Sequence, residues 1–371
     1  MLMRVLAPLA VAIQARVPVL LWGPPGTGKS SSVLALGRAL GMPVEVVIAS
    51  IREPADFAGL PVPDGVFCLN GQQIRSVHLA PPAWAVRLAQ AGRGILFLDE
   101  ISTAPPAVQA ALLRVILDRV VGDLSLPPGV AVAAAANPPE QAAGGWDLAA
   151  PLANRFCHLT WGLDASAWAD GMLRGWPAPE VPRLPEGWET DVPAARALVA
   201  SFIRARPHLL LQVPREESRA GGAWPSPRTW DMAARLLAAC AAAQAEEDVE
   251  AILLAGCVGE GPAHEFLRWR RELDLPDPEE LLAAPESFQL PPRGDQQYAV
   301  LAAVVAAAVR EPVKRDRLAA AWRVIDAARQ QGGGDIAAWA VGPLAEASSR
   351  VGYVAPEARH FRPLLQQAEV K

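Results

Sequence analysis

The sequence predicts an α/β domain followed by a region made only of helices. Up to residue 161, strand-like apolar runs alternate with stretches of helical periodicity, and turns rich in Gly and Pro separate them. After Trp161 the strand-like runs stop. Such alternation is typical of a parallel sheet covered by helices. We therefore expect an α/β core over residues 1–161, a helical lid over 162–247 and a helical extension over 248–371.

The expected strands are the five apolar runs of the first region, at residues 17–22, 44–48, 95–98, 130–136 and 156–159. Between the third and the fourth, apolar residues recur at i, i+3, i+4, i+7 and i+8, which is one face of a helix: Val108, Ala111, Leu112, Val115 and Ile116. In the helical region, the clearest segments are 193–206 and 228–242. We expect the tryptophans at 161, 168, 176 and 188 to pack helices together.

The composition excludes several classes of protein. Half of the 371 residues are hydrophobic, which indicates a globular chain, and the net charge of −5 argues against a general nucleic-acid binder. Nothing reaches the roughly 18 uncharged apolar residues that a membrane span needs. Because Gln14 and Arg16 interrupt the apolar N-terminal run, we expect a helix of a cytoplasmic protein there rather than a signal peptide.

The cysteines indicate neither a zinc site nor a disulfide framework. Cys68, Cys157, Cys240 and Cys257 are widely scattered and form no C-x-x-C pair. We expect reduced, mostly buried thiols, and we interpret the Cys157-His158 pair as part of the core rather than as a metal ligand set.

The first motif that carries chemistry is Gly23-Pro24-Pro25-Gly26-Thr27-Gly28-Lys29-Ser30-Ser31, which follows a strand-like run and opens a helix. Glycines let the backbone turn tightly, so that its N–H groups surround a phosphate at the positive end of a helix. In this pattern Lys29 reaches the β- and γ-phosphates of a nucleotide, and the Ser30 hydroxyl ligates Mg²⁺. The alternative is a glycine-rich turn without a ligand.

Two further strand ends carry polar side chains. The run Gly94-Ile95-Leu96-Phe97-Leu98 ends in Asp99 and Glu100. A carboxylate there suits the Mg²⁺ water shell, which we assign to Asp99, and the next one suits polarisation of an attacking water, which we assign to Glu100. The fourth strand ends in Asn137-Pro138-Pro139, where an amide can bind the γ-phosphate or the water. The alternative for Asn137 is an Asx turn before proline.

Taken together, these motifs resemble those of the AAA+ ATPases. Asn154-Arg155-Phe156 and Ser226-Pro227-Arg228 follow them in the order expected of that family. The resemblance implies a five-stranded parallel sheet in the order 5-1-4-3-2, a helical lid and a homo-oligomer, usually a hexameric ring. It also implies that Asn137 is sensor 1, Arg155 the arginine finger and Arg228 sensor 2.

Several residues depart from that pattern or allow another reading. Asn154 stands where the family often has Asp, and Arg119 or Arg114 are alternatives for the finger. Arg155 can also be a surface cation that caps a helix end, and Arg228 a cation at a helix start.

Within the AAA+ ATPases the sequence is similar to the MoxR branch of the helix-2-insert clade. The run from Arg52 to Leu60, the run from Glu100 to Pro106 and the segment from Arg119 to Asp123 carry this likeness. We expect residues 51–78 and 119–128 to stand off the sheet as hairpins or loops on the face that meets a partner.

The resemblance implies Mg²⁺-dependent ATP hydrolysis that remodels or activates a protein partner in a chaperone-like manner. A protein with a von Willebrand factor A domain is the expected partner, and nucleic acid and membrane are not expected. Two alternatives stay open. One is a DNA-directed motor of the same clade, although residues 51–78 carry only Arg52 and Arg75 as fixed cations. The other is a nucleotide-dependent scaffold with little turnover, against which Glu100 argues.

Overall fold

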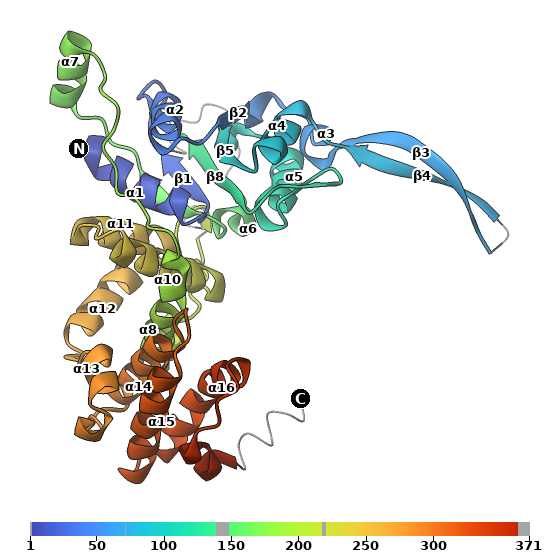
Figure 1. The fold of residues 1–371 in the computed structure, drawn as a ribbon. Coiled ribbons are helices and arrows are strands. Elements are labelled where there is room, and N and C mark those ends of the chain that lie inside the picture. Colours follow the sequence, from blue (N-terminus) through green and yellow to red (C-terminus); the bar gives the residue numbers. More distant parts are fainter. Residues whose placement is uncertain (1, 71, 139–147, 217–219, 363–371) are drawn as a thin grey trace. The chain divides into compact units, whose positions relative to one another are not determined.

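A computed structural model describes residues 2–70, 72–138, 148–216 and 220–362 (Figure 1). Contacts between residues divide the chain into two compact units. The first comprises residues 1–185 and 211–263, and the second residues 186–210 and 264–371. The boundaries of these two units are not those of the three domains expected at 1–161, 162–247 and 248–371. The three-domain division stays a prediction.

A five-stranded parallel sheet is the centre of the first unit, as predicted. Its order is β2-β5-β8-β1-β9, which is 2-3-4-1-5 when only these strands are counted and therefore the expected order read from the other edge. The strands are β1 (Val19–Trp22), β2 (Val44–Ile48), β5 (Arg93–Asp99), β8 (Gly129–Ala136) and β9 (Cys157–Thr160). Each begins within two residues of the expected start, because mainly apolar runs suit the strands of a parallel sheet that helices cover.

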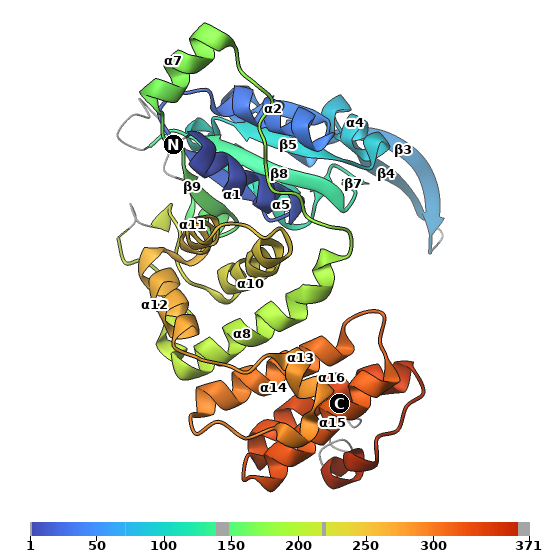
Figure 2. The ribbon, with the colours of Figure 1, turned by 60° about the vertical axis from the view of Figure 1, so that its left-hand side comes forward.

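Helices cover both faces of this sheet (Figure 2). Alternate strand residues such as Leu20, Leu96 and Val132 share a buried cluster with α4 (Ala83–Ala91) and α5 (Pro106–Leu117). On the other face, α1 (Leu2–Gln14) contacts β8 and β9, and α2 (Lys29–Leu40) contacts β2 and β5. The apolar stripe predicted from Val108 to Ile116 is the buried side of α5, apart from the half-buried Ala111.

Two hairpins leave the sheet, as expected for residues 51–78 and 119–128. The long one pairs β3 (Leu60–Leu69) with β4 (Gln72–Ala80), and it extends well beyond the sheet in Figure 1. A short helix, α3 (Ala55–Ala58), precedes it. The short hairpin pairs β6 (Val120–Val121) with β7 (Leu124–Ser125).

The remaining helices of the first unit follow the core strands. They are α6 (Ala150–Ala153), α7 (Ala165–Arg174), α10 (Pro227–Ala242) and α11 (Glu247–Val258). Two of them, α10 and α11, pack against α1, and α11 also contacts β9. Trp168 and Trp176, expected to pack helices, are 48% and 57% exposed, while Trp161 and Trp188 are buried.

The second unit is helical. Its helices are α8 (Val192–Ala205), most of α12 (Glu260–Arg271), α13 (Pro278–Ala283), α14 (Gly294–Val309), α15 (Arg315–Gln330) and α16 (Gly334–Arg350). Its core is built around Trp322, Val300 and Leu344. Among the described residues of the whole chain, every helix is too short or too polar to cross a membrane.

Candidate nucleotide site

The loop between β1 and α2 forms a cradle at the start of a helix. Gly26 and Gly28 have left-handed backbones, with φ of 74° and 86°, and α2 begins at Lys29 directly after Gly28. A Cβ atom on either glycine would meet nothing within 4 Å, so backbone conformation, not crowding, requires glycine there. Backbone N–H groups at the start of a helix have no partner within the helix and attract anions.

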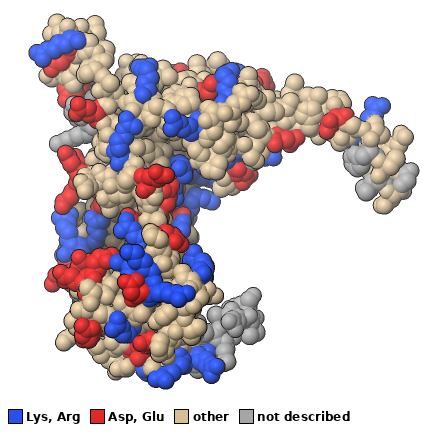
Figure 3. Space-filling view, viewed as in Figure 1, with Lys and Arg blue, Asp and Glu red and all other residues tan. Residues whose placement is uncertain are grey.

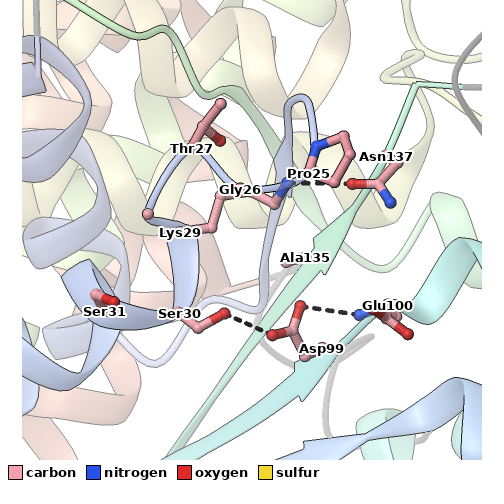
Figure 4. A pocket seen from close by; sticks show the side chains of 11 residues that line it. Pro25, Gly26, Thr27, Lys29, Ser30, Ser31, Asp99, Glu100, Ala135 and Asn137 are labelled. Atoms are coloured by element: carbon pink, nitrogen blue, oxygen red, sulfur yellow. Dashed lines mark hydrogen bonds between the residues drawn. The ribbon is translucent and has the colours of Figure 1, made fainter.

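A pocket of about 350 Å³ lies between this loop and the carboxyl ends of two neighbouring strands (Figure 4). The loop and the start of α2 line it with Pro25, Gly26, Thr27, Gly28, Lys29, Ser30 and Ser31. The strand ends contribute Asp99, Glu100, Ala135 and Asn137. The structure therefore brings together predicted residues from three separate motifs, which are far apart in the sequence.

Lys29 is held at one wall of the pocket by three oxygen atoms. Its Nζ donates to the Gly23 carbonyl at 2.5 Å, to the Pro24 carbonyl at 2.9 Å and to Asn137 Oδ1 at 3.2 Å. Burial lowers the pKa of Lys29, and the nearby carboxylates of Asp99 and Glu100 act in the opposite direction. Gly23 and Pro24, which belong to the predicted nucleotide motif, thus hold Lys29 through their carbonyl oxygens and do not line the pocket.

Ser30 and Asp99, which the sequence predicts to bind Mg²⁺, contact each other. The Ser30 hydroxyl donates to Asp99 Oδ2 at 2.5 Å. Over the described residues no cluster of three His, Cys, Asp or Glu side chains exists that could hold a metal alone. A hydroxyl with one carboxylate beside a phosphate cradle fits Mg²⁺, which keeps several waters and binds through one or two carboxylates plus substrate phosphates.

Glu100 has an unusual backbone and a hydroxyl partner. Its φ of 55° and ψ of 39° are left-handed, a conformation that costs a non-glycine residue of order 1–3 kcal/mol. The Ser50 hydroxyl donates to Glu100 Oε2 at 2.6 Å, and the Thr103 hydroxyl donates to its carbonyl at 2.9 Å. The sequence carried no signal for Ser50, because only the fold brings the end of β2 beside the end of β5.

Asn137 is fixed by a second residue that the sequence analysis missed. Its backbone N–H donates to Ser102 Oγ at 3.2 Å, and Ser102 is buried. Its side-chain oxygen accepts from Lys29. This amide can therefore contact both the lysine and a group bound in the pocket.

Arg155 and Arg228 lie near each other, outside the set of residues that line the pocket. The pKa of Arg155 is lowered by burial and by the charge of Arg228. Arg155 donates through Nη1 to the Pro151 carbonyl, while its buried Nε has no hydrogen-bond partner. The exposed Arg228 donates to Asn154 Oδ1 at 3.4 Å.

Asn154 joins the two segments that carry these arginines. It is buried, its side-chain oxygen accepts from Ser226 Oγ at 2.8 Å, and its amide donates to the Trp224 carbonyl at 3.4 Å. Ser226 also caps the start of α10, where it accepts from the Thr229 N–H. The residue that departs from the family pattern thus anchors the helix that bears Arg228.

Two tryptophans tie β9 and the residue after it to the phosphate loop and to the end of β1. Trp161 Nε1 donates to the Thr27 carbonyl at 3.1 Å, and a Cβ on Gly23 would lie only 2.8 Å from the Trp161 carbonyl. Trp22 Nε1 donates to His158 Nδ1 at 2.8 Å, while His158 Nε2 lies 2.9 Å from the Ala153 carbonyl. Burial lowers the pKa of His158 to about 4, so the ring is neutral, with Nε2 as the donor.

Comparison with known proteins agrees with this geometry. Residues 18–156 match the family described as AAA domain (dynein-related subfamily), while no curated protein matches the chain. A crystal structure named "putative ATPase" from Cytophaga hutchinsonii ATCC 33406 is 20% identical, covers 71% of this chain and 88% of its own, and has a TM-score of 0.43. A full-length MCM homolog from Methanopyrus kandleri is also 20% identical, covers 69% of this chain and 55% of its own, and has a TM-score of 0.33.

The matched family, the five-stranded sheet and the pocket occupy the same part of the chain. The match begins just before β1 and ends just before β9, so it contains the phosphate loop, Asp99, Glu100 and Asn137. Residues 18–156 are therefore similar to an AAA domain in sequence, and they carry a five-stranded parallel sheet and a pocket suited to a nucleotide.

Proposed function

We propose that this chain binds ATP with Mg²⁺, hydrolyses it at an interface between subunits and uses the cycle to remodel a protein partner, as MoxR-type ATPases do. One observation carries the proposal. Lys29, Ser30, Asp99, Glu100 and Asn137 converge on one pocket, while Arg155 and Arg228 lie together outside its lining. A complete phosphate site with separate arginines fits an enzyme whose arginines act on a neighbouring copy.

The chemistry follows from the positions of the side chains. Loop amides and Lys29 hold the β- and γ-phosphates, and Mg²⁺ at Ser30 and Asp99 neutralises their charge when bound. Glu100 orients and deprotonates the water that attacks the γ-phosphate, and Asn137 positions that water or the phosphate. Arg155 of the next subunit acts as the arginine finger and Arg228 as sensor 2, and both neutralise charge that develops in the transition state.

The test separates binding from turnover. Lys29→Ala removes the contact with ground-state phosphates and should abolish nucleotide binding. Glu100→Gln keeps the shape of the side chain but not its basicity, so binding should persist while hydrolysis falls by about 10²-fold or more. Calorimetric titration with ATP and a phosphate-release assay measure the two effects. Normal hydrolysis by the Glu100→Gln protein would disprove the assignment.

A protein partner is favoured over DNA by the surface of the β3–β4 hairpin. In Figure 3 most of this projection is neither acidic nor basic. Val66 and Val77 are each 56% exposed, and Asp64 offsets Arg75. DNA binding rests on dense Lys and Arg, whereas exposed apolar side chains suit a protein surface. ATPase activity measured with and without DNA separates the two readings, because a DNA-directed motor should be stimulated.

The proposal includes a hexameric ring and a partner with a von Willebrand factor A domain. Native mass spectrometry of the Glu100→Gln protein with ATP tests the ring. A pull-down with the same variant, in which the ATP state persists, tests the partner, with Lys29→Ala protein as the matched control. A nucleotide-dependent scaffold remains the second candidate, and slow turnover by the wild-type ring would favour it.

A further inference from the structure

The β3–β4 hairpin depends on its root for its direction. It forms a sheet of two strands only, and two strands alone in water are marginally stable. Side chains along it, such as Val66 and Val77, are exposed. Whatever holds Gly59, Leu60, Leu79 and Ala80 at the root therefore decides where the hairpin points.

One residue of the short hairpin binds both backbone groups of Leu79. The Leu79 N–H donates to Asp123 Oδ2 at 2.6 Å, and the Asp123 N–H donates to the Leu79 carbonyl at 2.9 Å. Asp123 lies in the turn between β6 and β7. A hydrogen bond to a carboxylate is stronger than one between neutral groups.

Two glycines allow the turn of the short hairpin to approach the root of the long hairpin closely. Gly59 and Gly122 have φ of 89° and 59°, and a Cβ on Gly59 would lie 2.6 Å from the Gly122 Cα. A Cβ on Gly122 would lie 2.4 Å from the Leu79 carbonyl oxygen. The neighbours are backbone atoms, which cannot rotate away as a flexible side chain can. The two turns therefore touch backbone to backbone.

The turn at Gly122 is itself fixed to the core. Val121 and Leu126 on either side of it are buried, and the Leu126 N–H donates to the Arg119 carbonyl at 2.7 Å. The Gly122 N–H donates to the carbonyl of the buried Phe57 at 3.3 Å. The short hairpin thus has little freedom of its own.

Each of the two hairpins is connected to residues that line the pocket. Upstream of the short hairpin, α5 follows the loop that bears Glu100, and downstream β8 ends just before Asn137. Upstream of the long hairpin, Ser50 donates to Glu100. A shift of Glu100 or Asn137 can therefore reach the root through the short hairpin, and a shift of Glu100 can also reach it through Ser50.

We propose that Gly122 and Asp123 form a root clamp, which fixes the direction of the β3–β4 hairpin and transmits movements at Glu100 and Asn137 to it. The transmission rests on the proposed function, because it requires a nucleotide cycle. The fixing of the hairpin does not.

A native cysteine on the long hairpin allows a spin label to be attached there without a further substitution. Cys68 on β3 is exposed, whereas Cys157, Cys240 and Cys257 are buried, so a thiol-reactive nitroxide should label Cys68. Electron paramagnetic resonance then reports the mobility of the hairpin. The test variants are Asp123→Ala, Gly122→Ala and Asp123→Asn, the last of which keeps an acceptor oxygen without the charge.

Two variants of the long hairpin itself serve as matched controls. Asp64→Ala removes an exposed acid, and Gly65→Ala adds a Cβ that would meet nothing within 4 Å. Neither touches the root. Circular dichroism of every variant checks that the α/β core is folded. If Asp123→Ala does not fold, Asp123→Asn still tests the proposal.

We expect Asp123→Ala and Gly122→Ala to mobilise the label, Asp123→Asn to do so less, and the controls to leave it unchanged. Exchange of the Leu79 amide hydrogen should rise about tenfold or more in Asp123→Ala, because a charge-assisted hydrogen bond is lost. Basal ATPase should stay within about twofold of wild type, since no bond to a pocket residue is removed.

Wild-type label mobility and Leu79 exchange in both Asp123→Ala and Gly122→Ala would overturn the clamp. Transmission is tested by adding ATP to the labelled Glu100→Gln protein, which should change the spectrum only while Asp123 is present. A spectrum that does not respond, in protein shown to bind ATP, overturns transmission. Absence of ATP binding by wild-type protein would instead count against the proposed function, and the mobility result would still judge the clamp.

Discussion

The pocket and the arginine pair differ in how their polar groups are satisfied. In the pocket, Lys29 and Ser30 each have oxygen partners at 2.5 Å. Outside its lining, Arg155 has a buried Nε without a partner, and Arg228 reaches only a neutral amide at 3.4 Å. The polar groups of the pocket are satisfied within it, whereas Arg155 lies near the like charge of Arg228 and is opposed by the carboxylate of Asp118. Under the proposed function, one chain binds the nucleotide and a second chain completes the catalytic site, and this difference is what that proposal leads us to expect.

The largest effect on activity is expected from loss of Arg155. If this residue acts on a neighbouring subunit, Arg155→Ala should bind ATP almost normally and hydrolyse it about 10³-fold more slowly, because transition-state charge is no longer neutralised. Phosphate release at saturating ATP measures the loss. Arg114→Ala and Arg119→Ala are the matched comparisons, and a comparable loss in one of them, with Arg155→Ala unaffected, would assign the finger elsewhere.

Mixing two inactive proteins shows whether the arginine acts between subunits. Lys29→Ala subunits cannot use their own pockets but can still lend Arg155 to a neighbour with an intact pocket. Co-assembly with Arg155→Ala subunits should restore activity that neither protein has alone. Lack of rescue, in assemblies shown by native mass spectrometry to contain both, would return Arg155 to a surface cation that caps a helix end.

The next largest effect concerns His158, which ties the end of β1 to the residue before Asn154. Its folded pKa of about 4 lies below the usual 6.5, so the unfolded chain takes up the proton first as the pH falls. The stability that the neutral ring provides is complete above pH 6.5 and is lost as the pH falls towards 4. The shift corresponds to roughly 3 kcal/mol of free energy of unfolding. Urea unfolding followed by tryptophan fluorescence between these pH values should show this slope, and His158→Gln should reduce it. An equal slope in both proteins would contradict the buried neutral ring.

The smallest effect is expected at Gly23, where the phosphate loop packs against Trp161. Gly23→Ala places a methyl group 2.8 Å from the Trp161 carbonyl and 2.9 Å from its Cβ, so the loop or β9 must move. Overpacking of this kind costs about 1–3 kcal/mol, and we expect roughly tenfold weaker binding of ATP. Titration with a fluorescent ATP analogue measures it, with Gly65→Ala as the control. Unchanged affinity would mean that the loop is not fixed by Trp161.

Local patterns sufficed to predict the elements and the residues of the pocket. The strands were predictable because each is a mainly apolar run, and Lys29, Asp99, Glu100 and Asn137 because each follows such a run in a recognised order. The contacts of Ser50, Ser102, Trp161 and Asn154 were not predictable, since they join residues from distant segments whose meeting depends on the tertiary fold. The exposure of Cys68 was not predictable for the same reason, because it follows from a hairpin whose two strands pair only with each other in the described part of the chain.

Because of the pairing register of β1 with β8, we expect β8 to tolerate insertions and deletions less well than the β3–β4 hairpin does. Trp22 lies opposite Ala136, and the Gly23 N–H donates to the Ala136 carbonyl at 3.1 Å, so the phosphate loop and Asn137 leave the sheet at one level. Deleting a single alanine from β8 would draw Asn137 back by about 3.3 Å and turn alternate side chains to the wrong face. Removing one facing pair from the outer part of β3–β4 would only shorten a projection. Insertions and deletions that separate related chains should therefore collect in the hairpin and spare β8.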